Sequence, residues 1–279
     1  MPELPEVETV RHALENKLKN KTIKSINILY PNIFEGQNIN VITEKIKDNK
    51  INSIKRRGKW LIFELDNYYL LNHLRMEGKY LYRDIKAPIE KHEHVIFNIS
   101  NEFELRYKDV RKFGKMYLVN KNELEKEKHL SKLGLEPWDK NLSSSYLKEK
   151  YKNKKIPIKK VLLDQNIIVG IGNIYADEIL FLSKINPFKN ASDLNDKELN
   201  NIINNTKIIL DNAIKKGGTT IRSYTSEEGV TGRFQNDLYV HSREGLKCLK
   251  CSNIIKKDKI GGRSTYYCEI CQNVKRDIG

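Results

Sequence analysis

The pattern of hydrophobic and polar positions changes in successive segments of the chain. Residues 3 to 20 place apolar side chains at helical spacing and acidic side chains in the first turn, which predicts an amphipathic helix. Its apolar positions are Val7, Val10, Leu14 and Leu18. From about residue 23 to 120, short apolar runs separated by polar turns predict strands: "IKSINILY", "KWLIFEL", "YYLLNHL", "HVIFNIS", "FELRYK" and "KMYLV". This spacing is typical of a β-sandwich, here with an N-terminal helix.

A highly charged stretch with a proline, "VNKNELEKEKHLSKLGLEPWDKN", follows the strands, and we place a domain boundary near residue 135. From about residue 143 to 216 the pattern is helical, and its clearest helix covers residues 194 to 216. Asn195 and Glu198 match a capping box at the start of this helix, and a double glycine follows its end. A polar loop, "SYTSEEGVTGRFQND", comes next.

The chain is strongly basic. It has 51 lysine and arginine residues against 36 aspartate and glutamate residues, a formal net charge of +15 over 279 residues. This balance favours nucleic acid as the partner, with an anionic membrane surface or a lysine-rich proteome as the alternatives. No apolar run has the length of a bilayer-spanning helix, and the acidic N-terminus has no apolar signal region. We therefore expect a cytoplasmic protein without membrane contact.

The four cysteines form two C-x2-C pairs, Cys248 with Cys251 and Cys268 with Cys271, separated by sixteen residues. This spacing is typical of a four-thiolate zinc site, which is closed and therefore structural rather than catalytic. Two disulfides or a redox-active C-x2-C are the alternatives, and a cytosolic chain with no spare cysteine disfavours both. We predict one structural zinc ion.

The segment between the cysteine pairs, "SNIIKKDKIGGRSTYY", predicts two short strands joined at Gly261 and Gly262. Zinc would make such a hairpin rigid enough to press basic side chains onto a phosphate backbone. These side chains are Lys256, Lys257, Lys259 and Arg263.

The stretch "LLDQNIIVGIGNIYADE" contains a G-x-G that does not fit a dinucleotide site, because the third glycine and the ribose-binding acid are missing. No nucleotide cofactor is expected. A turn between helices fits better: Gly170 and Gly172 let backbone N–H groups approach a phosphate, and the Asn173 amide adds a donor. Lys159, just upstream, is either a second phosphate contact or a solvated lysine.

Three further stretches carry basic side chains next to aromatic or sulfur-containing ones: "RRGKW", "HLRMEGKY" and "DVRKFGKM". Taken alone, the first is either a solvated basic turn or a functional one, and Met76 in the second is more often a core side chain than a functional one. The third is expected to place Arg111 and Phe113 on one strand face, where they either pack or act as a wedge in unstacked DNA.

The N-terminus, "MPELPEVE", is unusual because Pro2 follows the initiator methionine. Removal of Met1 leaves a secondary amine, which attacks an aldehyde-like carbon and forms an iminium ion. The positive end of a helix disfavours protonation of this amine, whereas Glu3 and Glu6 favour it. Glu3 is placed as a proton shuttle, and Glu6, one turn further on, as a residue that orients it.

These stretches together resemble the formamidopyrimidine-DNA glycosylases, bacterial base-excision repair enzymes for oxidised purines. The motifs that carry the resemblance, in order, are "PELPEVE", "RRGKW", "HLRMEGKY", "DVRKFGKM", "LLDQ…GIGNIYADE", "GGTTIRSY" and "GGRSTYYC". They cover essentially the whole chain, and their order is what makes the match specific.

The resemblance implies an α+β multidomain clamp around DNA. Residues 1–135 would form the catalytic β-sandwich with its N-terminal helix, residues 136–235 a helix–two-turns–helix domain, and residues 236–279 a four-cysteine zinc finger. The partner would be duplex DNA with a damaged base, such as 8-oxoguanine or a formamidopyrimidine, bound by a monomer. After excision, β- and δ-elimination would cut the strand on both sides of the sugar.

The resemblance also implies residue roles. Pro2 would attack C1′ of the damaged nucleotide, Glu3 would act as acid and base, and Lys59 would assist at the adjacent phosphate. Met76, Arg111 and Phe113 would fill the gap left by the flipped base. The other expected DNA contacts are His73, Lys159, Asn173 and Arg263.

One departure from the family pattern stands before the zinc element, where the usual Tyr-Gly-Arg is His241-Ser242-Arg243. The loop from Tyr224 to Thr231, expected near the flipped base, has no dependable pattern.

Two alternatives remain at this point. An endonuclease VIII-type glycosylase for oxidised pyrimidines shares the chemistry but usually begins Pro-Glu-Gly-Pro, and a non-catalytic zinc-ribbon nucleic-acid binder leaves the N-terminal residues unexplained.

Overall fold

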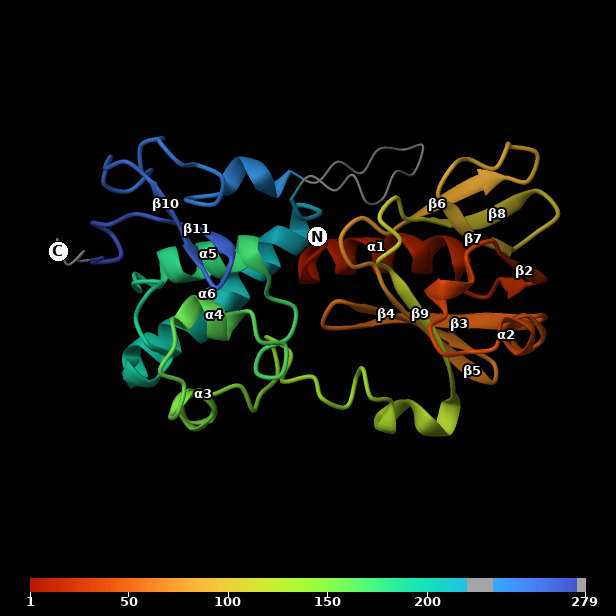
Figure 1. The fold of residues 1–279 in the computed structure, drawn as a ribbon, viewed down its shortest axis with the longest axis horizontal. Helices are drawn as coiled ribbons and strands as arrows, with labels where there is room; N and C mark the ends of the chain where they lie inside the picture. The colour runs from red at the N-terminus through yellow and green to blue at the C-terminus, as the bar shows by residue number, and fades with distance from the viewer. Residues whose placement is uncertain (220–232, 275–279) are drawn as a thin grey trace. The chain divides into compact units, whose positions relative to one another are not determined.

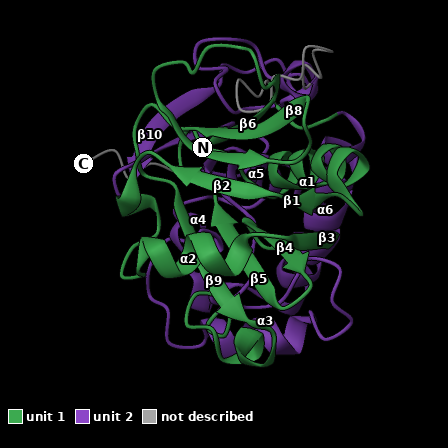
Figure 2. Cartoon of the chain, turned by 90° about the vertical axis from the view of Figure 1, so that its right-hand side faces the viewer, with its two compact units in different colours: residues 1–132, 217–232 green, residues 133–216, 233–279 purple. Residues whose placement is uncertain are grey.

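The computed structural model of the chain describes residues 1–219 and 233–274. The chain forms two compact units: unit 1 is residues 1–132 with 217–232, and unit 2 is residues 133–216 with 233–279 (Figure 2). The finer division at residues 135 and 235 remains a prediction. Most of the expected loop "SYTSEEGVTGRFQND" lies outside the described residues, and the segment from Tyr224 to Thr231 lies wholly outside them. None of the helices in the described part of the chain has the length and hydrophobicity to cross a membrane.

Unit 1 is a sandwich of two antiparallel sheets (Figure 1). The five-stranded sheet has the order β1 (Thr22–Ile23), β3 (Asn49–Arg57), β4 (Trp60–Leu65), β5 (Tyr68–His73) and β9 (Lys115–Asn120). The four-stranded sheet has the order β2 (Ser25–Ile28), β7 (Glu93–Asn98), β8 (Phe103–Lys108) and β6 (Lys79–Asp84). The predicted β-sandwich and the six predicted strand runs are therefore confirmed.

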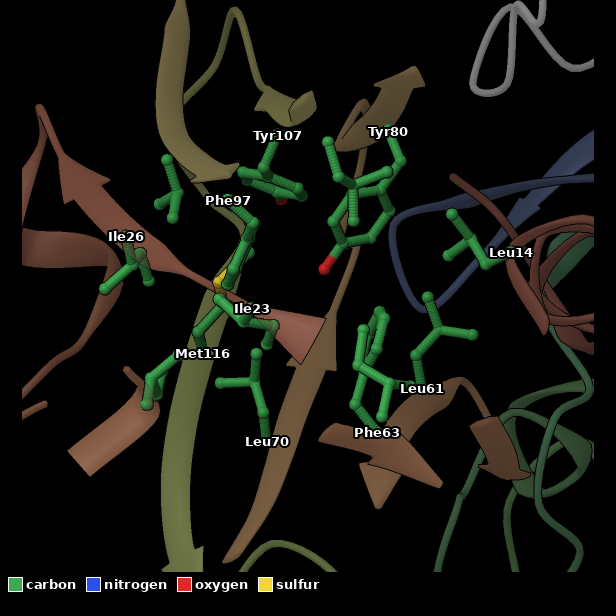
Figure 3. Packing of buried hydrophobic residues seen from close by; sticks show 14 of the residues in the cluster. Leu14, Ile23, Ile26, Leu61, Phe63, Leu70, Tyr80, Phe97, Tyr107 and Met116 are labelled. Atoms are coloured by element: carbon green, nitrogen blue, oxygen red, sulfur yellow. The ribbon is translucent and has the colours of Figure 1, made fainter. Parts of the chain in front are cut away.

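The inner faces of the two sheets meet in one hydrophobic core. Phe63 and Leu70 of one sheet face Phe97 and Tyr107 of the other, and the ring of Phe63 lies 5.8 Å from that of Tyr80 (Figure 3). Alternation along the strands produces this arrangement, because successive side chains point to opposite faces of a sheet.

Helix α1 (Leu4–Leu18) runs alongside the sandwich and completes this core (Figure 1). Its predicted apolar positions are all buried: Val7, Val10, Leu14 and Leu18. The amphipathic helix expected from the sequence is confirmed, and its packing fixes the direction of the chain's first residues.

None of the predicted strand runs covers β3 or β6, and neither the helix α2 (Ile39–Ile46) nor the 3-10 helices of unit 1 were predicted. Strand β3 has the sequence "NKINSIKRR", and its register shifts between Ile51 and Ser53, so its apolar positions do not alternate cleanly. Two short 3-10 helices, η1 (Pro31–Ile33) and η2 (Lys121–Lys126), complete the described elements of this unit.

Unit 2 is helical and ends in a β-hairpin. Its elements are α3 (Ser144–Tyr151), α4 (Ile158–Leu162), α5 (Asn173–Leu182), η3 (Ala191–Asp193), α6 (Asp196–Lys215), η4 (Phe234–Asp237), β10 (Lys256–Ile260) and β11 (Arg263–Tyr267). The predicted capping box is present, since Asn195 and Glu198 exchange hydrogen bonds of 2.9 and 3.0 Å. Gly261 and Gly262 both have positive φ, 54° and 75°, as the type I′ form of a two-residue hairpin turn requires.

The cysteine element belongs to the same hydrophobic cluster as helix α5. Phe181 of α5 packs with Val240, Cys248, Ile255 and Cys268, and its ring stacks on Tyr239 at 5.3 Å. The hairpin strand β11 also contacts α5. The zinc element and the helices therefore form one unit rather than a tethered finger.

Candidate catalytic N-terminus and metal centre

The N-terminus is held by the first turn of α1. Glu3 is the N-cap residue and forms a capping box with Glu6, whose Oε2 accepts the Glu3 backbone N–H at 2.9 Å. Both carboxylates are nearly inaccessible, at 2% and 3% exposure, and Pro2 before them is buried. This capping fixes the Pro2 nitrogen at the positive end of the helix, where a protonated amine is disfavoured.

The second oxygen of Glu6 binds a segment more than two hundred residues away in the chain. Glu6 Oε1 accepts from the backbone N–H of Thr219 at 2.9 Å and from its hydroxyl at 3.1 Å. Gly218 makes this approach possible, because a Cβ there would lie 2.6 Å from Glu6 Oε1. The sequence offered the motif "GGTTIRSY" but no signal that it meets the N-terminal helix.

Lys59 occupies the two-residue turn between β3 and β4. Gly58 has φ 56°, which suits the first central position of a type II′ turn, and Lys59 is only 6% exposed. Arg56 in the same hairpin forms an ion pair of 2.9 Å with Glu8 of α1. Lys59 is therefore carried by a hairpin anchored to the helix that carries Pro2 and Glu3.

His73, at the end of β5, lies beside this hairpin. Its ring packs edge-on against Trp60 with centroids 4.9 Å apart, and its Nδ1 accepts the backbone N–H of Arg75 at 3.0 Å. Burial, followed by the charges of Arg75 and Lys59, lowers the pKa of His73 to about 3. His73 is therefore neutral near pH 7, and with Nδ1 as an acceptor it presents Nε2–H as its free donor.

Met76, Arg111 and Phe113 lie in two turns rather than on strands. Met76 is in the turn between β5 and β6, while Arg111 and Phe113 are in the loop between β8 and β9. The expectation of one strand face for Arg111 and Phe113 is therefore wrong. Asp109 shapes the loop instead, accepting the backbone N–H of Arg111 at 3.1 Å and of Gly114 at 2.7 Å. The Arg111 guanidinium lies over the Phe113 ring at 4.7 Å, and Phe113 is 49% exposed.

One buried tyrosine brings these two turns together. A Cβ at Gly78 would lie 2.2 Å from the Tyr107 hydroxyl, and a Cβ at Gly114 would lie 1.8 Å from it. Gly78 follows the turn of Met76, and Gly114 follows the loop of Phe113. Both turns therefore rest on the same phenol, a relationship that the sequence did not indicate.

In unit 2, Asn173 is the first residue of α5, after the N-cap Gly172. Gly170 has φ 89°, so the turn before the helix uses the freedom of glycine. The Asn173 amide donates to the Ser264 carbonyl of β11 at 3.0 Å, next to the exposed Arg263. The structure thus brings Asn173 and the hairpin together, as two predicted phosphate contacts require.

Lys159 is placed differently from the other predicted contacts. Its side chain is fully buried, and its Nζ lies 2.6 Å from Asp177 Oδ1 and 2.7 Å from the Ser264 carbonyl. A solvated lysine is excluded by this geometry. A direct phosphate contact by Lys159 finds no support in this conformation and stays a prediction.

The four cysteines form the metal centre. Their Sγ atoms all lie within 4.8 Å of one another, with 3.8 Å between Cys248 and Cys271 and 3.4 Å between Cys251 and Cys268. None forms a disulfide. Four sulfurs at about 2.3 Å around a tetrahedral zinc ion lie about 3.8 Å apart, so the cluster fits zinc. The backbone N–H of Asn253 lowers the pKa of the Cys251 thiol, whereas burial raises the pKa of the Cys268 and Cys271 thiols. Zinc would bind all four as thiolates, because metal binding releases the thiol protons.

Three family models match the chain in the order of its parts. They are the formamidopyrimidine-DNA glycosylase N-terminal domain over residues 1–116, the formamidopyrimidine-DNA glycosylase H2TH domain over residues 133–225, and the zinc finger found in FPG and IleRS over residues 245–274. The third match agrees with one structural zinc ion bound by the cysteine cluster.

Full-length relatives and solved structures agree with these models. Formamidopyrimidine-DNA glycosylase of Bacillus cereus is 46% identical over 98% of this chain and 99% of the relative, and that of Bacillus subtilis is 44% identical over 99% and 100%. A Lactococcus lactis FPG mutant in complex with Fapy-dG-containing DNA superposes with a TM-score of 0.92 at 39% identity, covering 98% of this chain and all of the other. The Lactococcus lactis Fpg complex with abasic-site DNA gives the same values. The endonuclease VIII-type and non-catalytic alternatives are set aside, because the chain belongs to the formamidopyrimidine-DNA glycosylase family.

Proposed function

We propose that the chain excises oxidised purines, 8-oxoguanine and formamidopyrimidines, from duplex DNA and then cleaves the abasic strand. The single observation that carries this is the capped N-terminus, where Glu3 and Glu6 fix the residue that becomes a secondary amine when Met1 is removed. The Lactococcus lactis relatives bound to Fapy-dG and abasic-site DNA support the substrate class.

The first step forms a bond between the Pro2 nitrogen and C1′, while the electron pair of the glycosidic bond leaves with the base. The amine proton released on attack needs an acceptor, and the sugar ring oxygen needs a proton when the ring opens. Glu3, adjacent to the amine, suits both transfers. The product is an iminium ion at C1′, which cannot lose an N–H proton and therefore remains an electron sink.

The iminium ion acidifies the C2′ hydrogen, so loss of that proton expels the 3′ phosphate in β-elimination. A second elimination expels the 5′ phosphate, and hydrolysis of the iminium frees Pro2. Lys59 is proposed to assist at the phosphate adjacent to the reacting sugar. Its place on the hairpin tied to α1 through Arg56 and Glu8 supports this role.

The remaining site residues are proposed to hold the distorted duplex. Exposed Phe113, with Arg111 stacked on it, and Met76 suit insertion into the gap left by a flipped base. His73 suits a neutral hydrogen bond to a phosphate, whereas Arg263 supplies charge and Asn173 a donor at the start of a helix.

The zinc ion supplies no chemistry in this scheme; it holds the base of the hairpin that carries Arg263. We also propose that the enzyme acts as a monomer, without a nucleotide cofactor, in the cytoplasm. The four cysteines free of disulfides suit that reducing compartment.

Borohydride trapping tests this proposal. The purified protein is mixed with a duplex carrying one 8-oxoguanine opposite cytosine, and borohydride is added during turnover. We expect a covalent protein–DNA complex whose modified residue maps to Pro2. Tight binding with no trapped complex, in protein whose first residue is proline, would contradict the proposal.

The N-terminal residue is the necessary control. If Met1 is retained, the Pro2 nitrogen is an amide and no trapping is expected. A Pro2→Gly variant keeps a free amine, and its complex must also map to residue 2. A parallel duplex with an oxidised pyrimidine measures substrate preference, and faster excision from that duplex would contradict the purine assignment.

A further inference from the structure

A buried polar network links the zinc element of unit 2 to helix α5. At its centre, Lys159 and Asp177 both have fully buried side chains, and their charged atoms lie 2.6 Å apart. A buried carboxylate needs a donor for each of its oxygens, because leaving one without a partner carries a large desolvation cost. Lys159 satisfies Oδ1 of Asp177.

His241 satisfies the other oxygen. Its Nδ1 lies 2.7 Å from Asp177 Oδ2, and because a carboxylate only accepts, Nδ1–H is the donor. The backbone N–H of His241 donates to Glu178 Oε1 at 2.9 Å, and its ring meets Tyr266 edge-on at 4.9 Å. His241 is therefore held at its ring by Asp177 and Tyr266 and at its backbone by Glu178.

The network ends at the hairpin strand β11. The carbonyl of Ser264 accepts from Lys159 Nζ at 2.7 Å and from the Asn173 amide at 3.0 Å. Arg263, the preceding residue, is exposed. Both proposed phosphate contacts, Arg263 and Asn173, are thus tied to the one carbonyl that Lys159 holds.

We propose that His241 is a positioning residue for DNA binding, which orients Asp177 and Lys159 and thereby fixes Ser264 and the two phosphate contacts beside it. The inference rests on the proposed function, since Arg263 and Asn173 must bind DNA. Lys159 then acts through the protein rather than on a phosphate. An imidazole that donates through Nδ1 is the feature of this chain's own sequence that completes the network.

The test compares two substitutions of His241. His241→Asn retains a donor near the position of Nδ1, whereas His241→Phe retains the ring and removes the donor. The probe is a duplex with one tetrahydrofuran abasic analogue, which binds without reacting. We expect His241→Phe to weaken binding roughly five- to tenfold, the usual effect of removing a partner from a buried charged group, and His241→Asn to stay within about twofold of the wild type. Equal affinity of all three proteins would overturn the proposal.

A double-mutant cycle with Arg263→Ala separates positioning from general loosening of the fold. If His241 acts through both Arg263 and Asn173, His241→Phe weakens binding less in the Arg263→Ala background than in the wild type. It also lowers the slope of log Kd against log salt as Arg263→Ala does, by about 0.9 for one lost phosphate contact. Additive effects with an unchanged slope would overturn the proposal. Zinc content and unfolding temperature are measured on every variant.

Trapping at saturating DNA keeps this inference distinct from the proposed function. The amount of borohydride-trapped complex in the His241→Phe variant should match the wild type once binding is saturated, because the Pro2 chemistry lies in unit 1. Absence of trapping in the wild type would count against the proposed function. The double-mutant cycle would still test the role of His241, because it measures DNA binding and not trapping. Loss of trapping in His241→Phe alone, at saturation, would contradict a role confined to binding.

Discussion

The carboxylate of Glu6 accepts two hydrogen bonds from Thr219, from its backbone N–H at 2.9 Å and from its hydroxyl at 3.1 Å. The other oxygen of the same carboxylate holds the backbone of Glu3. One side chain thus joins Glu3, the residue next to the proposed nucleophile Pro2, to the segment 217–219. Glu6 is better explained as a structural link between these segments than as a group that touches the reacting atoms.

Gly218→Ala tests this link. A Cβ at Gly218 would lie 2.6 Å from Glu6 Oε1, and the residue has φ 77°, so the substitution adds a clash to backbone strain. Gly36→Ala is the matched control, because Gly36 has φ 75° and nothing within 4 Å of its added Cβ. We expect Gly218→Ala to lower the free energy of unfolding by about 1–3 kcal/mol more than the control, and to slow trapping. Equal costs in urea titrations would show that the Glu6 contact is easily displaced.

The Tyr107 phenol yields a second prediction. Gly114→Ala places a Cβ 1.8 Å from the Tyr107 hydroxyl, so the loop of Arg111 and Phe113 must move. We expect a destabilisation of about 1–3 kcal/mol together with weaker binding to lesion-containing DNA. Adding Tyr107→Phe removes the clashing oxygen, and the double variant should therefore recover part of both losses. If the effects of Gly114→Ala and Tyr107→Phe on stability and DNA binding simply add, the clash with the Tyr107 hydroxyl is not the cause of the losses.

Local patterns explain what the sequence alone could predict. The cysteine spacing, the Asn195–Glu198 capping box and the apolar face of α1 are set by residues a few positions apart, and the structure confirms all three. The link from Glu6 to Thr219 and the burial of Lys159 depend on side chains brought together by the fold. Nothing in the sequence near Lys159 indicates that its side chain is buried in an ion pair with Asp177.

The prediction that Arg111 and Phe113 lie on one strand face was wrong for a related reason. Their spacing of two matches a strand, but Asp109 binds two backbone N–H groups and Lys112 takes φ 57°, so the chain turns. The Asp109 side chain competes for backbone N–H groups that a strand would use, and this outweighs the strand-like spacing of Arg111 and Phe113.

His73 predicts how stability depends on pH. Its pKa is lowered from about 6.5 to about 3 in the folded protein, mainly by burial, so between these values the unfolded chain binds a proton that the folded chain does not. The contribution of His73 to stability is therefore present above about pH 6.5 and is lost as the pH falls toward 3. We expect the free energy of unfolding to fall from pH 7 to pH 5, and to fall less in His73→Asn. Identical pH slopes in the two proteins would contradict a lowered pKa of His73 in the folded protein.

DNA binding should weaken steeply with salt, because each cation on a phosphate releases counterions. Arg263→Ala should lower the slope of log Kd against log salt by about 0.9, whereas Arg263→Lys keeps the charge and should leave the slope nearly unchanged. Fluorescence titrations of a tetrahydrofuran duplex at several salt concentrations measure this. A wild-type slope near zero would contradict phosphate contacts by the hairpin.

Loss of zinc should act on unit 2 through the packing of the cysteines. Cys268 is fully buried and shares a cluster with Phe181 of α5, so Cys268→Ser releases both the metal and the attachment of the hairpin. We expect zinc content to fall, DNA affinity to drop at least tenfold on the scale of a lost structural metal site, and the hairpin amides to lose protection from hydrogen exchange. The amides of β4 and β5 should keep theirs, because the sandwich core contains no residue of the cluster. Unchanged DNA binding after zinc loss would show that the cysteines hold the hairpin without contributing to its role.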